Sequence, residues 1–224
     1  MQTVLVTGAT RGIGKAEVQK FLREGYRVFA TSTSGTVDYA HENLEVFPLD
    51  LRSSESIAAC ASKVAGTHIP VDILINNAGV LLDEEETTLI PEKLRATLEV
   101  NLVGTAAFTE AILPLMSAQG IIVMTSSTAG SLTLVNRSLS HHPLHYPAYK
   151  ISKAALNMYM RSLALRLGGT GITVFSVHPG WVKTDMGGEE ADLTPEEAAE
   201  GIYETIIARP ETGGFYFKKE ELPW

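Results

Sequence analysis

The sequence predicts an α/β fold: a doubly wound, mostly parallel sheet of about seven strands, flanked by helices, in a single domain. Two observations lead to this prediction. Short runs rich in β-branched residues alternate with longer segments of helical period, which is the pattern of βαβ units. Several of these runs are apolar nearly throughout, as expected for strands that helices bury on both faces.

The expected strands are the apolar runs, taken in order along the chain. They comprise residues 3–7, 27–31, 44–47, 71–75, 121–125, 172–177 and 214–217. The expected helices are the segments between them, residues 13–24, 54–65, 91–116 in one or two pieces, 149–167 and 195–208. The last helix has a clear start, because Thr194 can cap it, Pro195 suits its first turn and Glu197 completes a capping box.

The composition is that of one globular domain spanning residues 1–224. Of these residues 45% are hydrophobic and 20% are charged, which excludes disorder as the main state.

The formal net charge of −8 repels phosphate backbones, so nucleic acid is not an expected partner. The single cysteine, Cys60, excludes an intrachain disulfide and fits a cytoplasmic location. No run approaches the ~18–20 apolar residues of a membrane span, so no membrane is expected either.

Irregular segments are expected at residues 32–43, 80–90, 131–147 and 179–193. All of them follow or lie near the carboxyl ends of expected strands, and ligands bind beyond these ends in open α/β sheets. We therefore expect the functional site there. The substrate-side loops are expected near residues 80–90, 131–147 and 185–193.

A glycine-rich turn directly follows the first expected strand and opens the first expected helix. It reads Thr7-Gly8-Ala9-Thr10-Arg11-Gly12-Ile13-Gly14. Glycine allows a tight turn and lets backbone N–H groups approach a pyrophosphate at the positive end of a helix dipole. The spacing Gly-x-x-x-Gly-x-Gly departs by one residue from the Gly-x-Gly-x-x-Gly dinucleotide fingerprint. The alternative is that the glycines only allow the strand and the helix to pack closely, with no nucleotide bound.

The end of the second expected strand favours NADP over NAD. An NAD site places a carboxylate there, about 20 residues past the loop, for the ribose 2′-hydroxyl. This sequence has no carboxylate before Asp38. Ser32, Thr33 and Ser34 can instead hydrogen-bond a 2′-phosphate. Arg11 can neutralise that phosphate, or it is simply a solvated cation of the loop.

Tyr149 and Lys153 are four residues apart and share one face of the expected helix. An ammonium ~4 Å away favours phenolate by about 4 kcal/mol at an effective dielectric of about 20, before desolvation offsets it. Such a pair brings the pKa of a phenol toward the range that acid/base catalysis uses. The alternative is that the two side chains form an ordinary pair on the protein surface. Tyr146 and Lys150 have the same spacing, but Pro147 suits a helix start, so Tyr146 is expected outside the helix.

Together with further motifs, these features resemble the short-chain dehydrogenase/reductase family over the whole chain. After the glycine turn come Asp50, Asn76-Asn77-Ala78-Gly79, Asn101, Ser126-Ser127-Thr128-Ala129-Gly130, the Tyr149 and Lys153 pair, and His178-Pro179-Gly180-Trp181-Val182-Lys183-Thr184-Asp185. This ordered set is far more specific than any one motif. The run through Gly188 and the ending Glu221-Leu222-Pro223-Trp224 are similar to the carbonyl reductase branch that includes C-factor and Sniffer.

The resemblance implies a Rossmann-like subunit in which Tyr149 is the proton donor and acceptor. Lys153 would bind the nicotinamide ribose and lower the pKa of the tyrosine. Ser127 would polarise the substrate carbonyl, and Asn101 would hold a water in the proton relay. The cofactor-binding residues expected from the motifs and the resemblance are Gly8, Thr10, Arg11, Gly12, Ile13, Gly14, Ser32, Thr33, Asp50, Leu51, Asn77, Ala78, Gly79, Tyr149, Lys153, Pro179, Gly180, Val182 and Thr184.

One departure from the family pattern is the long separation of Ser127 and Tyr149. The extra segment, residues 131–147, carries His141, His142 and His145. Pro143 interrupts these histidines and no thiolate or carboxylate set accompanies them, so no metal site is expected. We expect this segment to form a loop at the rim of the substrate pocket. Such a loop could cover the helix faces through which family members assemble, so both a monomer and a homo-oligomer stay open.

The leading interpretation is an NADP(H)-dependent oxidoreductase that reduces an aldehyde or ketone to an alcohol, with Tyr149 donating the proton. Two hydroxyl donors and a cation stabilise the developing oxyanion without a metal. The alternative is a dinucleotide-binding sensor or signalling protein of the same fold without turnover. An epimerase or dehydratase ranks last, because it needs a larger region after Thr184. Trp181, Tyr146 and Leu134 are candidates for an apolar pocket lining, with ordinary packing as the alternative.

Overall fold

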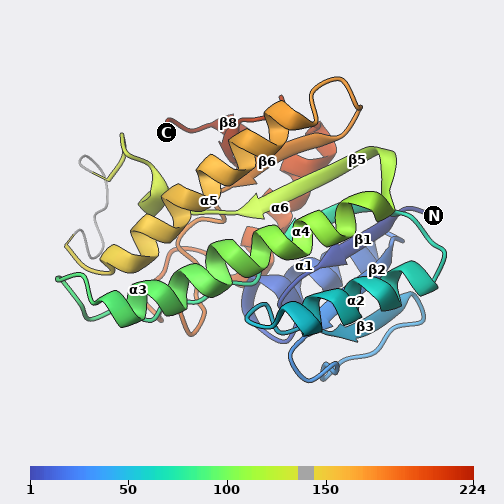
Figure 1. The fold of residues 1–224 in the computed structure, drawn as a ribbon, viewed down its shortest axis with the longest axis horizontal. Helices are drawn as coiled ribbons and strands as arrows, with labels where there is room; N and C mark the ends of the chain where they lie inside the picture. Colours follow the sequence, from blue (N-terminus) through green and yellow to red (C-terminus); the bar gives the residue numbers. More distant parts are fainter. Residues whose placement is uncertain (136–143) are drawn as a thin grey trace.

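A computed structural model of the protein describes residues 1–135 and 144–224 (Figure 1). Its framework is one eight-stranded sheet in the order β3-β2-β1-β4-β5-β6-β7-β8. Neighbouring strands from β3 to β7 pair in parallel, and β8 pairs with β7 antiparallel. The strands are β1 (Thr3–Val6), β2 (Arg27–Ser32), β3 (Leu44–Pro48), β4 (Val71–Asn76), β5 (Met116–Thr125), β6 (Thr173–Val177), β7 (Phe215–Phe217) and β8 (Glu220–Glu221).

Helices cover both faces of the sheet (Figure 1). One face carries α1 (Gly12–Arg23) and α6 (Pro195–Ala208). The other carries α2 (Ser54–Gly66), α4 (Thr105–Ile112) and α5 (Pro147–Arg166). The remaining helical elements are α3 (Pro91–Leu98), the π-helix η1 (Glu99–Gly104) and the 3₁₀ turns η2 (Leu113–Leu115) and η3 (Thr128–Gly130).

Two hydrophobic cores lie on either side of the sheet. Val4 and Val6 of β1 pack with Phe21 of α1 in one core. Leu5, between them, points to the other face and packs in the core that contains Phe108 of α4. All five side chains are fully buried. Successive strand residues therefore face different cores, which explains why the strand sequences are apolar nearly throughout.

The expected elements are confirmed, with differences at a few boundaries. The capping box at the start of α6 is present, with the Thr194 hydroxyl and the Glu197 carboxylate each accepting from the other residue's backbone N–H. β5 begins at Met116 rather than at Ile121, because Met116 pairs with Val71 across an irregularity in the β4/β5 register. The short strand β8 was not expected, because its two exposed glutamates show no strand pattern.

Residues 91–115 form one continuous helical run from α3 to η2, which is one of the two forms expected. Within the described ranges it is the single helix long and apolar enough to cross a membrane, judged by length and composition alone. Its most apolar window has a mean hydropathy of 1.2. Core helices of soluble proteins meet the same criterion, and Phe108 and Ile112 of this run lie in the hydrophobic core.

Candidate active site

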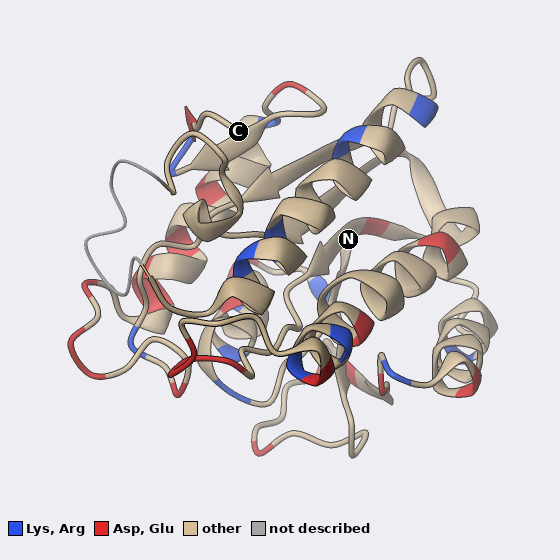
Figure 2. Ribbon diagram, turned by 60° about the vertical axis from the view of Figure 1, so that its left-hand side comes forward, with Lys and Arg blue, Asp and Glu red and all other residues tan. Residues whose placement is uncertain are grey.

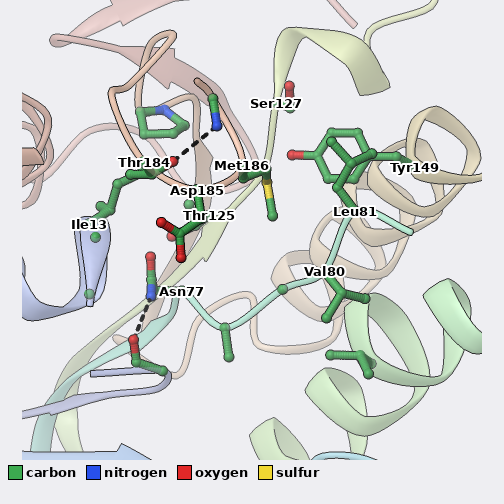
Figure 3. A pocket seen from close by; sticks show the side chains of 18 of the residues that line it. Ile13, Asn77, Val80, Leu81, Thr125, Ser127, Tyr149, Thr184, Asp185 and Met186 are labelled. Atoms are coloured by element: carbon green, nitrogen blue, oxygen red, sulfur yellow. Dashed lines mark hydrogen bonds between the residues drawn. The ribbon is translucent and has the colours of Figure 1, made fainter. Parts of the chain in front are cut away.

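A cavity of about 920 Å³ lies at the carboxyl ends of β1, β4, β5 and β6 (Figure 3). The strand order reverses between β1 and β4, and this is the position at which open α/β sheets bind ligands. The predicted site residues that line the cavity are Gly8, Thr10, Arg11, Gly12, Ile13, Gly14, Ser32, Thr33, Asp50, Leu51, Asn77, Ala78, Gly79, Ser127, Tyr149, Lys153, Pro179, Gly180, Val182 and Thr184. Asn101 does not line it, and neither does Ser34, which was expected to bind the 2′-phosphate.

The glycine turn forms one end of the cavity. Gly8 has a positive φ of 76° and Gly12 one of 54°, which glycine adopts without strain. A Cβ at Gly14 would collide with the carbonyl oxygen of Gly8, so this close approach also requires glycine. Asn77 fixes the turn from β4, because its side-chain amide donates to the Thr7 carbonyl at 2.9 Å. No side-chain hydrogen bond caps the N-terminus of α1, so backbone N–H groups there can receive a pyrophosphate.

The hydroxyl groups predicted to bind a 2′-phosphate lie at or just after the end of β2, and the predicted cation, Arg11, lies in the glycine turn before α1. The Ser32 hydroxyl is already engaged with the backbone of Thr36, accepting from its N–H at 3.0 Å and donating to its carbonyl at 2.9 Å. Thr33 is exposed and lines the cavity. Arg11 reaches across to Asp185 in an exposed ion pair at 3.2 Å. Thr33 and Arg11 are therefore the two groups best placed to meet a phosphate.

Asp50 lines the cavity after β3. Its carboxylate holds Arg52 with two side-chain hydrogen bonds, at 2.9 Å to Nε and 2.8 Å to Nη2. These hydrogen bonds lower the pKa of Asp50. The side chain is thus a fixed anion at this end of the cavity, and its contact with an adenine stays a prediction.

Tyr149, Ser127 and Lys153 line the opposite end of the cavity, where Figure 3 shows the Ser127 and Tyr149 side chains near one another. Ser127 follows β5, its hydroxyl accepts from the Ala129 N–H at 3.1 Å, and its side chain lies close enough to Tyr149 to act on the pKa of the phenol. The Lys153 ammonium lies 5.5 Å from the Tyr149 ring centre and donates to the Thr125 carbonyl at 2.7 Å. Helix α5 thus supplies the phenol and the cation, while the end of β5 supplies the second hydroxyl.

Burial sets the protonation of this cluster. It raises the pKa of Tyr149 to about 12, and the nearby Ser127 hydroxyl opposes that rise. It also lowers the pKa of Lys153 to about 8. The family resemblance implied a lowered pKa for the tyrosine, but the net shift is upward, because desolvation outweighs the stabilisation of phenolate. At neutral pH Tyr149 is therefore protonated.

Asn101 lies behind the cavity wall, in the π-helix between α3 and α4. Its side chain is 1% exposed. The amide oxygen accepts from Val80 N at 2.8 Å, and the amide nitrogen donates to Val80 O at 2.9 Å and to the Ser152 hydroxyl at 3.0 Å. Asn101 thus joins the loop after β4 to helix α5. Its predicted role in holding a water stays a prediction.

Apolar side chains from two loops line the cavity near Tyr149. Leu81 follows β4 and Met186 follows β6, and Figure 3 shows both beside the tyrosine. Trp181 and Tyr146 also line the cavity, as the sequence suggested, whereas Leu134 does not. Their indole, phenol and alkyl groups give the reacting end a mainly apolar wall.

The histidine-rich segment is only partly described. His141 and His142 lie outside the described residues, and His145 lies within them. Among described residues there is no group of three or more histidine, cysteine, aspartate or glutamate side chains placed to hold a metal ion.

Two structural contacts near the site were not found by sequence reasoning. Asp83 caps α5 from 65 residues away, and Pro223 and Trp224 anchor the chain just after Ser127. The Ser131 hydroxyl donates to the Pro223 carbonyl at 2.8 Å, and the Thr133 N–H donates to the Trp224 carbonyl at 2.8 Å. No local pattern signals such long-range pairs.

The fold, the glycine turn and the Tyr149 cluster are those of a short-chain dehydrogenase. The sequence matches the short chain dehydrogenase family over residues 2–194, and the chain belongs to that family. It is an oxidoreductase of this class. The motif order that predicted the family is thereby confirmed.

Comparisons with known proteins also support the predicted branch. The structure is similar to the carbonyl reductase Sniffer of D. melanogaster, with 28% identity, a TM-score of 0.87 and 100% of both chains covered. It is similar to the NADPH-bound carbonyl reductase from chicken fatty liver, with 28% identity and a TM-score of 0.89, covering 100% of this chain and 94% of that one. The C-signal protein of Myxococcus xanthus is 34% identical over 166 residues, which are 69% of this chain and 93% of that protein.

Proposed function

We propose that the protein is an NADP(H)-dependent carbonyl reductase that converts an aldehyde or ketone to an alcohol. The observation that carries the proposal is the placement of the Tyr149 phenol, the Ser127 hydroxyl and the Lys153 ammonium at one end of a cavity whose other end is the glycine turn. In open α/β sheets a dinucleotide binds with its pyrophosphate at the glycine turn, which leaves its nicotinamide free to extend along the cavity. The cavity of about 920 Å³ also leaves room for a small substrate.

The residues present fit NADP. Gly8, Gly12 and Gly14 leave the backbone open to a pyrophosphate. Arg11 supplies a positive charge to the cavity, and Thr33 stands at the end of β2 where an NAD site would have a carboxylate. The bound NADPH of the chicken carbonyl reductase, a protein of the same fold, supports this choice.

The reaction follows from the protonation and placement of the side chains. NADPH supplies the hydride that reduces the carbonyl carbon. The Tyr149 hydroxyl, protonated at neutral pH, donates its proton to the carbonyl oxygen as negative charge develops there. Ser127 donates a second hydrogen bond to the same oxygen. The Lys153 ammonium lies close enough to the Tyr149 ring to stabilise the phenolate left behind.

The apolar wall supports a small, uncharged carbonyl or alcohol as the partner molecule. The net charge of −8 argues against nucleic acid. The single cysteine is buried, in keeping with a reducing, cytoplasmic setting. Helix α5 exposes Ile151, Met158 and Leu165 at seven-residue spacing, which leaves a face available for a homo-oligomer.

A second candidate function is dinucleotide binding without turnover, as in a sensor or signalling protein. The similarity to C-signal favours it. The placement of Lys153 beside Tyr149 weighs against it, because a sensor without turnover has no need of an acid/base pair.

The test is NADPH oxidation with a panel of aldehydes and ketones, compared with NADPH binding followed by fluorescence. We expect turnover with apolar carbonyl compounds. We also expect Tyr149→Phe to lower kcat at least 100-fold while NADPH still binds, because proton transfer typically contributes 10²–10⁴-fold. Tyr203→Phe, on α6 away from the cavity, is the matched control. NADPH binding without consumption across the panel would favour the sensor instead.

A further inference from the structure

The helix that carries Tyr149 has no cap of its own. Tyr146, at the N-cap position of α5, makes no side-chain capping hydrogen bond and adopts a left-handed backbone conformation, with φ 50°. Pro147, the first helical residue, has no N–H to donate. The next N–H belongs to Ala148, which is fully buried and cannot reach water. An uncapped, buried helix N-terminus is costly unless another part of the chain provides acceptors.

Asp83 provides the missing acceptor. Its Oδ2 accepts from the Ala148 N–H at 2.6 Å, across 65 residues of sequence. The side chain is 1% exposed, and within the described residues its Oδ1 makes no hydrogen bond. A carboxylate is stabilised at a helix N-terminus by the positive end of the dipole. The nearby charge of Lys150 adds to this stabilisation.

A second backbone contact holds the same turn. The Tyr146 N–H donates to the Glu86 carbonyl at 2.9 Å, and the Glu86 N–H donates to the Asp83 carbonyl at 3.0 Å. The Glu86 side chain is itself held by Lys93 of α3, at 2.7 Å. We refer to residues 83–86 together with residues 146–148 as the clasp.

The clasp adjoins the reacting groups on both sides. Tyr149 directly follows it on α5, and the Tyr146 ring packs edge-on against the Tyr149 ring with centres 6.0 Å apart. Leu81 and Leu82, which line the cavity, directly precede it in the chain. A shift of the first turn of α5 would therefore move Tyr149 relative to Ser127 on β5.

We propose that Asp83 is a positioning residue, whose carboxylate holds the first turn of α5 so that the Tyr149 hydroxyl stays against Ser127. The inference rests on the proposed function for its kinetic consequence. Asp83 neither lines the cavity nor touches the reacting atoms, so it acts through the helix it caps. Misplacing a reacting group by about 1 Å can cost roughly 100-fold in rate.

The test compares Asp83→Ala, Asp83→Asn and the control Glu85→Ala. Glu85 is an exposed carboxylate in the same segment that does not line the cavity. For each protein, kcat, KM for the carbonyl substrate, NADPH affinity and the thermal unfolding midpoint are measured. Amide hydrogen exchange of peptides covering residues 146–153 reports on the first turn of α5 without requiring turnover.

For Asp83→Ala we expect a 10- to 100-fold loss of kcat, an NADPH affinity within about twofold of wild type, and at least tenfold faster exchange in residues 146–153. Asn also offers a side-chain oxygen to the Ala148 N–H, so Asp83→Asn should recover most of the lost kcat. Glu85→Ala should match wild type in every measurement.

Three results would overturn the proposal: an Asp83→Ala kcat within twofold of wild type, a loss of NADPH affinity in proportion to kcat, or Asp83→Asn as impaired as Asp83→Ala. If Asp83→Ala does not fold, Asp83→Asn decides: a two- to fivefold loss of kcat with faster exchange supports the proposal, and no change in either overturns it. A wild-type protein that reduces no carbonyl compound contradicts the proposed function, whereas the exchange comparison still decides whether Asp83 holds α5.

Discussion

The Lys153 ammonium donates a hydrogen bond to the carbonyl oxygen of Thr125, 2.7 Å away, and so joins α5 to the last residue of β5. Because Tyr149 lies one turn earlier on the same helix, this bond also fixes its phenol relative to Ser127, two residues beyond the end of β5. The lysine is 4% exposed, and its burial is what brings its pKa down to about 8. Lys153 thus links α5 to β5 and also places a group with a lowered pKa beside Tyr149.

The pH dependence of turnover should follow Lys153. Below about pH 8 its ammonium is charged and stabilises the phenolate that forms when Tyr149 gives up its proton. We therefore expect kcat for carbonyl reduction to fall as pH rises through about 8, approaching tenfold per pH unit. Measuring kcat between pH 6 and 9.5 checks this, with melting curves over the same range to exclude unfolding. A rate that stays constant or increases above pH 8 contradicts the assignment.

Arg11→Ala should weaken the use of NADPH but not of NADH. A charged hydrogen bond to a phosphate contributes about 1.5–3 kcal/mol, so kcat/KM for NADPH should fall about 10- to 100-fold. The substitution also removes the Arg11–Asp185 ion pair, but exposed pairs contribute little. Arg23→Ala, at an exposed position of α1, is the control. Equal losses with both cofactors would show that Arg11 does not read the 2′-phosphate.

Gly14→Ala should reduce NADPH affinity at least tenfold, because its Cβ would collide with the Gly8 carbonyl and displace the glycine turn. Gly66→Ala is a matched control: this helical glycine has open space at its Cβ position. It should retain NADPH affinity and gain about 0.5–1 kcal/mol of stability. Titration with NADPH, followed by fluorescence, distinguishes the two variants. Unchanged affinity in Gly14→Ala would mean that the turn tolerates a shift.

Glu17 should make the stability of the protein depend on pH. Its side chain on α1 is fully buried, and within the described residues neither carboxyl oxygen has a hydrogen-bond partner. Burial raises its pKa from 4.5 to about 8. Between these values the native state holds a proton that the unfolded state has lost, so the free energy of unfolding falls as pH rises toward 8.

The variant Glu17→Gln removes this titration while keeping the size of the neutral acid. At pH 5 we expect its stability to be close to wild type. At pH 9 it should be more stable by a few kcal/mol, since each unit of pKa shift corresponds to about 1.4 kcal/mol. Urea unfolding at both pH values measures the difference, and Glu45→Gln on the exposed side of β3 is the control. If the difference in stability between Glu17→Gln and wild type were the same at both pH values, the raised pKa of Glu17 would be contradicted.

The elements and motifs that depend on neighbouring residues could be predicted from the sequence. The capping box of Thr194 and Glu197 and the helix start at Pro147 are read from adjacent positions, and both are confirmed. The turn after β1 and the Tyr149–Lys153 pair carry their spacing within eight residues or fewer. The cavity then follows, because parallel strands bring their carboxyl ends to one edge of the sheet.

Properties that depend on distant residues could not be predicted. The bond from Ala148 to Asp83 joins two segments with no shared pattern. The upward pKa shift of Tyr149 comes from how much water the folded chain excludes, and spacing to Lys153 contains no information about that. The ion pair of Arg11 with Asp185 likewise depends on how two loops face one another across the cavity. Figure 2 shows acidic residues in several of the loops around this end of the sheet.

The reversal of strand order between β1 and β4 means that the two ends of the cavity come from different halves of the chain. A molecule bound along the whole cavity therefore ties those halves together. At a concentration 100 times its Kd, such a ligand adds about 2.7 kcal/mol to the free energy of unfolding. A bound nucleotide would then stabilise the fold as well as take part in turnover, so the measured stability of the protein would rise with cofactor concentration.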